Sequence, residues 1–97
     1  MADLRFDWDP RKRRANKAKH GVSFEEARTA FFDENARVIA DPEHSVGEER
    51  YILLGLSVQL RVLVVCHVYR EVDQVVRFIS ARRADPSERN QYVGYLP

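Results

Sequence analysis

The sequence predicts a small two-layer α+β domain, with two N-terminal helices and a short C-terminal helix packed on an antiparallel sheet of about four strands. Three observations predict this fold class. Helix-start signals and helical spacing of apolar residues occupy residues 9–31, segments rich in β-branched residues follow over residues 36–83, and a second Asp-Pro signal stands at residues 85–86. Such an order favours helices on one sheet face and an open, polar second face.

The length of 97 residues suffices for one hydrophobic core, so we expect a single domain over residues 1–97. The net charge is only +1, which lacks the basic excess typical of nucleic-acid binding. The charges are unevenly distributed, however. The segment "RKRRANKAK" contains no acid, whereas residues 33–49 contain six acids and one base, Arg37. Either both are solvated faces, or the basic one attracts phosphate.

Cysteine content and hydropathy predict a cytoplasmic protein that does not contact membranes. Cys66 has no partner for an internal disulfide, and no apolar stretch behind a charged start suggests a secretory leader. The longest apolar run, "VLVVC", is far too short to cross a bilayer as a helix. The sequence also has no Walker loop, GxGxxG, GxSxG or CxxC motif, which excludes the corresponding nucleotide-binding, serine-hydrolase and zinc-ribbon classes.

The first third of the chain reads as a strand and two helices. Residues 4–8, "LRFDW", form the predicted strand. Asp9-Pro10 begins a helix, as an N-cap acceptor before a proline at the first helical position, and Gly21 ends it as a left-handed cap. Ser23 begins the second helix through a capping box with Glu26. Its apolar stripe consists of Phe24, Ala27, Ala30 and Phe31.

The rest of the chain reads as strands followed by one helix. The predicted strands are residues 36–40, 50–55, 60–70 and 74–83. The short connections at residues 56–59 and 71–73 favour antiparallel hairpins, and residues 41–49 form a long polar loop. Asp85, Pro86 and Glu88 repeat the helix-start signal before the short terminal helix.

Strand alternation predicts which side chains share a sheet face. In residues 60–70, one face carries Arg61, Leu63, Val65, His67 and Tyr69, and the other carries Leu60, Val62, Val64, Cys66 and Val68. We predict that the uniformly apolar second set faces the helices, with Cys66 as an inert core residue, and that the first set is a partly solvated working surface. In residues 74–83, Phe78, Ser80 and Arg82 point one way and Arg77, Ile79, Ala81 and Arg83 the other.

The three histidines suggest different roles. His67 interrupts an apolar strand, and a neutral imidazole there could act as a general acid or base. The alternative is a half-buried histidine bonded to a neighbour. His20 suits the negative end of a helix dipole. His44 lies among acids, but this spacing is weak as a metal-ligand pattern, and we predict no metal site.

Three arginines could converge on an anion. Arg82 and Arg83 end the last strand, and Arg50 begins an earlier one. The planar guanidinium group binds phosphate through paired hydrogen bonds and keeps its charge. Since Arg82 and Arg83 face opposite ways, one is expected to anchor the fold against Asp85 or Glu88 while the other faces an open site. The alternative is that strand-end arginines only aid solubility.

Three segments together resemble the BrnT family of toxins from bacterial type II toxin-antitoxin modules. They are "FDWDPRKRRANKAKHGVSFEEARTAF", "DPEHSVGEERYILLG" and "RFISARRADPSERNQY", and they cover nearly the whole chain in family order. The resemblance implies a RelE-like fold and an endoribonuclease that cleaves RNA without metal or cofactor and slows translation. It also implies a BrnA-type antitoxin whose ribbon-helix-helix part binds operator DNA, a complex of two toxins and two antitoxins, and a co-repressor role.

The resemblance also implies roles for the candidate residues. Arg50, Arg82 and Arg83 would stabilise the phosphate and the transition state, and His67 is the leading acid or base. The RNA-binding set comprises Lys19, His20, Arg61, Arg77 and Tyr92. Lys19 with His20, or Lys19 with Tyr92, could transfer protons in place of His67, and Glu49 is a reserve base. The alternative to an enzyme is a non-catalytic module that docks an antitoxin through a basic cleft.

Overall fold

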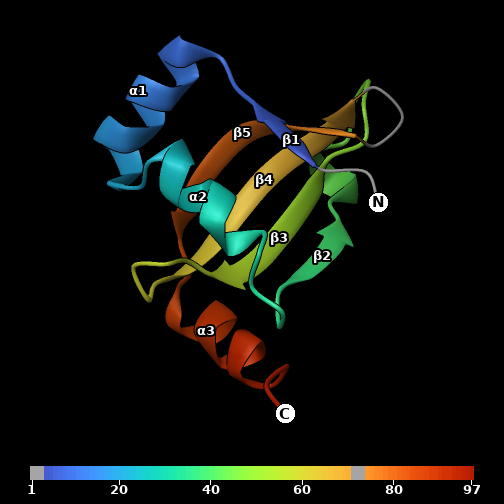
Figure 1. Cartoon of the computed structure of the whole chain (residues 1–97). Helices are drawn as coiled ribbons and strands as arrows, with labels where there is room; N and C mark the ends of the chain where they lie inside the picture. Colours follow the sequence, from blue (N-terminus) through green and yellow to red (C-terminus); the bar gives the residue numbers. More distant parts are fainter. Residues whose placement is uncertain (1–3, 71–73) are drawn as a thin grey trace.

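The computed structural model describes residues 4–70 and 74–97, and this part of the chain contains a five-stranded sheet and three α-helices (Figure 1). The α+β class is as expected. The elements in chain order are β1 (Arg5–Asp7), α1 (Pro10–His20), α2 (Phe24–Ala30), β2 (Arg37–Ala40), the 3-10 helix η1 (Pro42–His44), β3 (Tyr51–Leu56), β4 (Val62–Arg70), β5 (Val75–Arg83) and α3 (Pro86–Val93).

The sheet has the strand order β1-β5-β4-β3-β2. Strands β2 to β5 pair antiparallel, whereas β1 lies parallel to β5 with Phe6 opposite Val76. The sheet is therefore mixed and five-stranded, which corrects the expected antiparallel sheet of about four strands. The pairing of β1 joins the two ends of the chain, so no local pattern in the sequence indicates it.

The two predicted hairpins have different outcomes. The connection between β3 and β4 is a hairpin, closed by the N–H of Ser57 donating to the carbonyl of Arg61 at 2.9 Å. Strands β4 and β5 also pair antiparallel, as expected. The turn predicted at residues 71–73 lies outside the described residues.

The predicted caps of α1 and α3 are confirmed. Asp9 accepts a hydrogen bond from the N–H of Arg11 at 2.8 Å, and Gly21 ends α1 with φ 71°, in the left-handed region. At the start of α3, Asp85 accepts from the N–H of Glu88 at 2.8 Å, and Glu88 accepts from the N–H of Asp85 at 2.9 Å. Both helix starts therefore follow directly from the local sequence.

The capping box predicted for α2 is only half present. Ser23 accepts from the N–H of Glu26 at 3.0 Å, as expected. The carboxylate of Glu26 does not return to Ser23. It is buried and accepts hydrogen bonds from Ser57 at 2.7 Å and from Arg61. A tertiary ion pair has therefore replaced the local bond.

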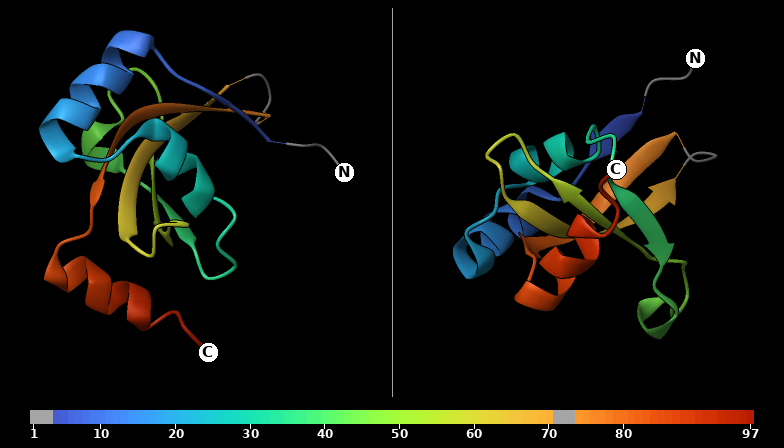
Figure 2. Two further views of the ribbon diagram at one scale, coloured as in Figure 1. Left: turned by 60° about the vertical axis from the view of Figure 1, so that its left-hand side comes forward. Right: turned by 90° about the horizontal axis from the view of Figure 1, so that it is seen from below.

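The main core lies between the sheet and the helices α1 and α2, which cover one sheet face (Figures 1 and 2). Its buried members are Val22, Phe24, Ala27, Ala30, Leu53, Leu63, Val65, Val76, Phe78 and Ala81. Helix α3 does not join this layer. It packs through Tyr92 against Leu54 and Val64 on the opposite face. This corrects the expectation that all helices cover one face.

The two faces of β4 are the reverse of those predicted. Leu63, Val65 and His67 are fully buried on the side of α1 and α2, while Val64 and Cys66 lie on the open face. The predicted alternation is correct, but the apolar set faces outward. His67 is tolerated in the core because its Nδ1–H donates to the carbonyl of Val65 at 3.0 Å and its Nε2 accepts from Tyr69 at 3.1 Å.

A β-bulge in β5 shifts the side chains that follow it. The register between β4 and β5 changes between Cys66 and His67, with Cys66 opposite Ser80 and His67 opposite Phe78. Phe78 is in the core, whereas Ser80 and Arg82 line the open face. Simple alternation had placed these three residues on one face. The extra residue of the bulge separates them and aims the end of β5 at the open face.

Candidate functional site

The open face of the sheet carries a pocket of about 230 Å³. Three strands, β3, β4 and β5, form its floor, and the β2–β3 loop with η1 forms one wall. The lining residues are Asp41, His44, Arg50, Ile52, Val64, Cys66, Ile79, Ser80 and Arg82. The pocket therefore combines an apolar floor with two arginines, two hydrogen-bonding side chains and one carboxylate.

Arg50 is one of the two arginines that line this pocket. Its Nε is shielded from solvent and has no hydrogen-bond partner among the described residues. The guanidinium group also lies within hydrogen-bonding reach of the Cys66 thiol. Burial raises the pKa of the adjacent Cys66 thiol, although the charge of Arg50 opposes this rise. Cys66 is thus a neutral neighbour, and its predicted place in the main core is wrong.

Arg82 reaches the same pocket but is held by an acid. Its two terminal nitrogens donate to the carboxylate of Glu88 at 2.8 and 2.9 Å. This pairing raises the pKa of Arg82 and lowers the pKa of Glu88. Glu88 also closes the capping box of α3, so the start of that helix fixes the guanidinium group.

Arg83 is exposed and does not line the pocket. The prediction that Arg82 and Arg83 face opposite ways fits this placement. We expected one of the two arginines to anchor the fold and the other to face the site. Arg82 does both, since it binds Glu88 and also lines the pocket.

A second pocket of about 250 Å³ adjoins the first on the side of α1. Ile79 and Ser80 line both pockets, so the two pockets are adjacent. Helix α1 contributes Lys12, Ala15, Asn16, Lys19 and His20 to its wall. Asn16 holds α1 in place, since its amide donates to the carbonyl of Ala81 at 2.8 Å and accepts from the N–H of Ala81 at 3.0 Å. The structure thus brings the predicted residues Lys19 and His20 beside the arginine pocket.

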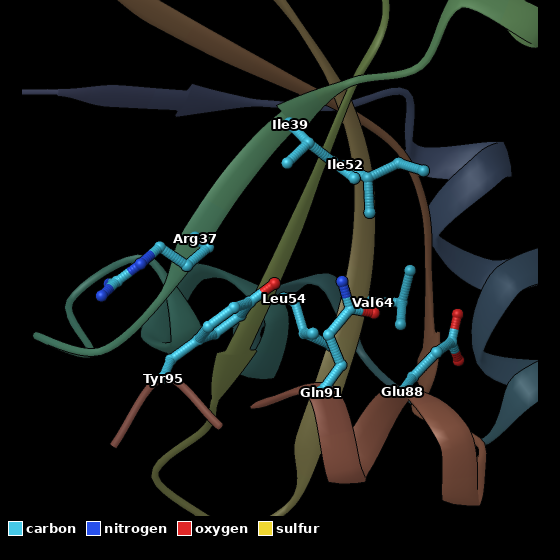
Figure 3. A pocket seen from close by; sticks show the side chains of 8 residues that line it. All are labelled: Arg37, Ile39, Ile52, Leu54, Val64, Glu88, Gln91 and Tyr95. Carbon is cyan, nitrogen blue, oxygen red and sulfur yellow. The ribbon is translucent and has the colours of Figure 1, made fainter. Parts of the chain in front are cut away.

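A third, smaller pocket lies between α3 and the strands β2, β3 and β4 (Figure 3). It shares Ile52 and Val64 with the arginine pocket. Figure 3 shows Gln91 and Glu88 extending from α3 toward the strands, with Arg37 and Tyr95 on the other side. The guanidinium carbon of Arg37 lies 5.0 Å from the centre of the Tyr95 ring. The three pockets therefore follow one another across the open face.

His67 lies on the far side of the sheet from Arg50 and Arg82. It is fully buried, and its ring contacts Phe31 edge-on at 4.9 Å between centroids. Burial lowers the pKa of His67 to about 4, so the imidazole is neutral at physiological pH. The alternative considered from the sequence, a histidine bonded to a neighbour, describes this geometry.

Three residues of the predicted RNA-binding set are engaged elsewhere. Arg61 is bound to the buried Glu26, and Arg77 forms an ion pair with Asp7 beside β1. Tyr92 is buried under α3, where its hydroxyl donates to Asp33 at 2.5 Å. Burial and this carboxylate raise the pKa of Tyr92 to about 12. The reserve base Glu49 is exposed, accepts from Tyr51 at 2.9 Å and does not line the arginine pocket.

Sequence reasoning missed several residues that the structure brings to the pocket. Asp41 and His44 line it together, with Nδ1 of His44 2.8 Å from Oδ2 of Asp41. Ser80 and Cys66 were assigned from regular alternation, which the bulge and the reversed faces overturn. A signal for the first pair was available, since the segment "DPEHSVGEER" contains both residues and ends in Arg50.

These features define a small α+β protein with a cationic pocket on the open face of its sheet, suited to an anionic ligand. Residues 8–88 match the model of a family described as the ribonuclease toxin BrnT of a type II toxin-antitoxin system. The chain therefore belongs to the BrnT family of toxins, which confirms the resemblance.

One solved structure supports the same fold. It is the 1.1 Å crystal structure of the Brucella abortus ribonuclease toxin BrnT, which matches with a TM-score of 0.66 and 24% sequence identity, over 84% of this chain and 97% of that chain. No curated protein matches the chain. In the described part of the chain, no helix has the length and apolar character needed to span a membrane.

Proposed function

We propose that this chain is the toxin of a type II toxin-antitoxin module and an endoribonuclease that needs no metal ion. The description of its family as a ribonuclease toxin supports this activity. The observation that carries the proposal for this chain is the open pocket that Arg50 and Arg82 line together. Guanidinium groups bind phosphate through paired hydrogen bonds, so the two arginines suit an RNA phosphate.

The cleavage chemistry requires cations at the phosphate that is attacked. When the 2′-hydroxyl attacks the adjacent phosphate, negative charge develops on the non-bridging oxygens, and fixed donors stabilise it. Arg50 and Arg82 supply these donors. Glu88 occupies two of the five N–H groups of the Arg82 guanidinium, which leaves others for the phosphate. The adjoining pocket contains Lys12, Lys19 and His20, which bind the RNA backbone next to the attacked phosphate.

Two predicted catalytic residues have no role in this proposal. His67 is buried on the opposite sheet face, and Arg83 does not line the pocket. We likewise assign no RNA contact to Arg61, Arg77 or Tyr92, because each is bound to a carboxylate away from the pocket.

The proposed partner is a BrnA-type ribbon-helix-helix antitoxin in a complex of two toxins and two antitoxins, which binds operator DNA through the antitoxin. Membership of a toxin-antitoxin family supports such a partner. The groove of Figure 3 offers apolar contacts, since Ile39 is 54% exposed beside Ile52. This groove also favours the second candidate function, a non-catalytic module that only docks an antitoxin.

Expression of the chain alone in bacteria separates the two functions. We expect growth arrest with loss of RNA, and Arg50→Ala should relieve both because one transition-state donor is typically worth about 100-fold or more in rate. Arg13→Ala is the matched control, since Arg13 forms an exposed ion pair with Glu25 on α1. Normal growth and intact RNA with the wild-type chain would contradict the ribonuclease activity and favour the non-catalytic docking module.

A further inference from the structure

We propose that His44 is the catalytic residue that transfers the proton in this pocket, and that Asp41 positions it. The inference rests on the proposed ribonuclease function and adds the general base that His67 cannot provide. Both residues line the arginine pocket, and Nδ1 of His44 lies 2.8 Å from Oδ2 of Asp41. No other histidine of the described residues lines this pocket.

The two side chains differ in exposure in the way that an oriented base requires. The side chain of Asp41 is 12% exposed, whereas that of His44 is 63% exposed. A carboxylate only accepts hydrogen bonds, so Nδ1 carries the proton of the neutral ring and Nε2 is left with a free electron pair. The exposed imidazole is thus held in the tautomer that can take a proton from a ligand.

Hydrogen bonds of the loop connect this pair to Arg50. The N–H of Asp41 donates to the carbonyl of Arg50 at 2.8 Å, and the N–H of Arg50 donates to the hydroxyl of Ser45 at 2.9 Å. Ser45 in turn donates to the carbonyl of Asp41 at 2.6 Å. The backbone of Arg50 is therefore bound on both sides to the loop that carries His44. A phosphate bound by Arg50 would meet an imidazole held in a defined position.

The charged and titratable groups around His44 favour this role over other candidates. The strands contribute Arg82, which is paired with Glu88, and Cys66, while the β2–β3 loop contributes Arg50. Helix α1 contributes Lys12, Lys19 and His20 through the adjoining pocket. Asp41 is the only carboxylate that lines the arginine pocket in the described chain, and it is bound to His44. His44 therefore combines an oriented tautomer with a place beside the two arginines.

In the proposed step, Nε2 of His44 takes the proton of the 2′-hydroxyl while the 2′-oxygen forms a bond to phosphorus. The bond between phosphorus and the 5′-oxygen breaks, and the 5′-oxygen keeps the electron pair. This oxygen takes a proton from water, and the imidazolium returns its proton to the hydroxide so formed. The products are a 2′,3′-cyclic phosphate and a 5′-hydroxyl, with no net proton change.

The test compares His44→Ala, Asp41→Asn and Glu43→Gln in the purified full chain, with a short oligoribonucleotide as substrate. His44→Ala should lower kcat by about 100-fold or more with little change in KM, remove the acid limb of the pH profile and respond to added imidazole. Asp41→Asn should lower kcat by about 10-fold and keep that limb. Glu43→Gln, in the same loop but outside the pocket, should match the wild type.

Each result separates the inference from the proposed function. If the wild type cleaves, Arg50→Ala does not and His44→Ala keeps its kcat and acid limb, then the role of His44 is wrong while the ribonuclease stands. If the wild type itself leaves the RNA intact, both fail. Thermal unfolding of His44→Ala serves as the fold control, because an exposed side chain should be replaced with little loss of stability.

Discussion

Burial decides what a single titratable side chain can do in this molecule. His67 in β4 is fully buried, whereas the side chain of His44 in η1 is 63% exposed. The buried ring is satisfied by Val65 and Tyr69 and stays neutral, whereas the exposed ring is oriented by Asp41. The first therefore supports the core, and the second is available for chemistry.

The lowered pKa of His67 predicts a loss of stability in mild acid. The unfolded chain binds the proton near the ordinary value of 6.5, while the folded chain resists it down to about 4. The free energy of unfolding should therefore fall as the pH is lowered through this window, by on the order of 3 kcal/mol in all. Urea denaturation at several pH values measures it.

His67→Gln should flatten this dependence between pH 6.5 and pH 4.5, above the range in which carboxyl groups dominate. His20→Gln is the control and should keep the slope. An unchanged slope in His67→Gln would show that another group causes the acid loss.

The element that most directly builds the pocket is the end of β5 together with the start of α3. The bulge turns Ser80 and Arg82 to the open face, and the capping box of α3 places Glu88 against Arg82. A helix cap thus also orients a guanidinium group of the pocket. Glu88, which helps to begin the helix, also connects it to the pocket.

Glu88→Ala should therefore affect both stability and activity. Loss of the capping contact should cost about 1 kcal/mol, seen as a lower thermal midpoint. Release of Arg82 should reduce kcat/KM for RNA by about 10-fold or more, because a misplaced donor stabilises the transition state less well. Ser87→Ala, exposed on the same turn, is the control. Wild-type kinetics in Glu88→Ala would mean that Arg82 needs no such support.

Local signals predicted the elements well and the long-range arrangement less well. The caps at Asp9, Gly21 and Asp85 depend on neighbouring residues, so the sequence indicates them directly. The parallel pairing of β1 and the bulge in β5 depend on distant partners. The same is true of Glu26, which forgoes its local bond for Arg61.

The structure brings part of the predicted site together, and the roles of these residues stay predictions. Arg50, Arg82, Lys19 and His20 line adjoining pockets, because exposed cations lie beside the open face. His67 was assigned to the wrong sheet face because both faces of β4 are apolar enough to be covered by helices. Its hydrogen bond inside the core offsets the cost of burying the imidazole. A periodic pattern cannot show which of two such faces the helices cover.

At the scale of the whole molecule, the residues of the main core and those of the proposed site lie on opposite faces of the sheet. One face carries α1, α2 and the main core (Figures 1 and 2). The other face carries the arginine pocket, which η1 and the edge of α1 border. The near-neutral net charge thus conceals a locally cationic surface. Substitutions on the open face should therefore change activity with less effect on folding than those in the main core.

The most direct test of the central claim is cleavage of a defined oligoribonucleotide by the purified chain in the presence of a metal chelator. We predict a product ending in a 2′,3′-cyclic phosphate, and no cleavage where the attacking 2′-hydroxyl is replaced by hydrogen. Arg50→Ala should reduce the rate by about 100-fold or more while its thermal midpoint stays near that of the wild type. Intact RNA with the wild-type chain, or wild-type cleavage by a folded Arg50→Ala variant, would contradict the claim.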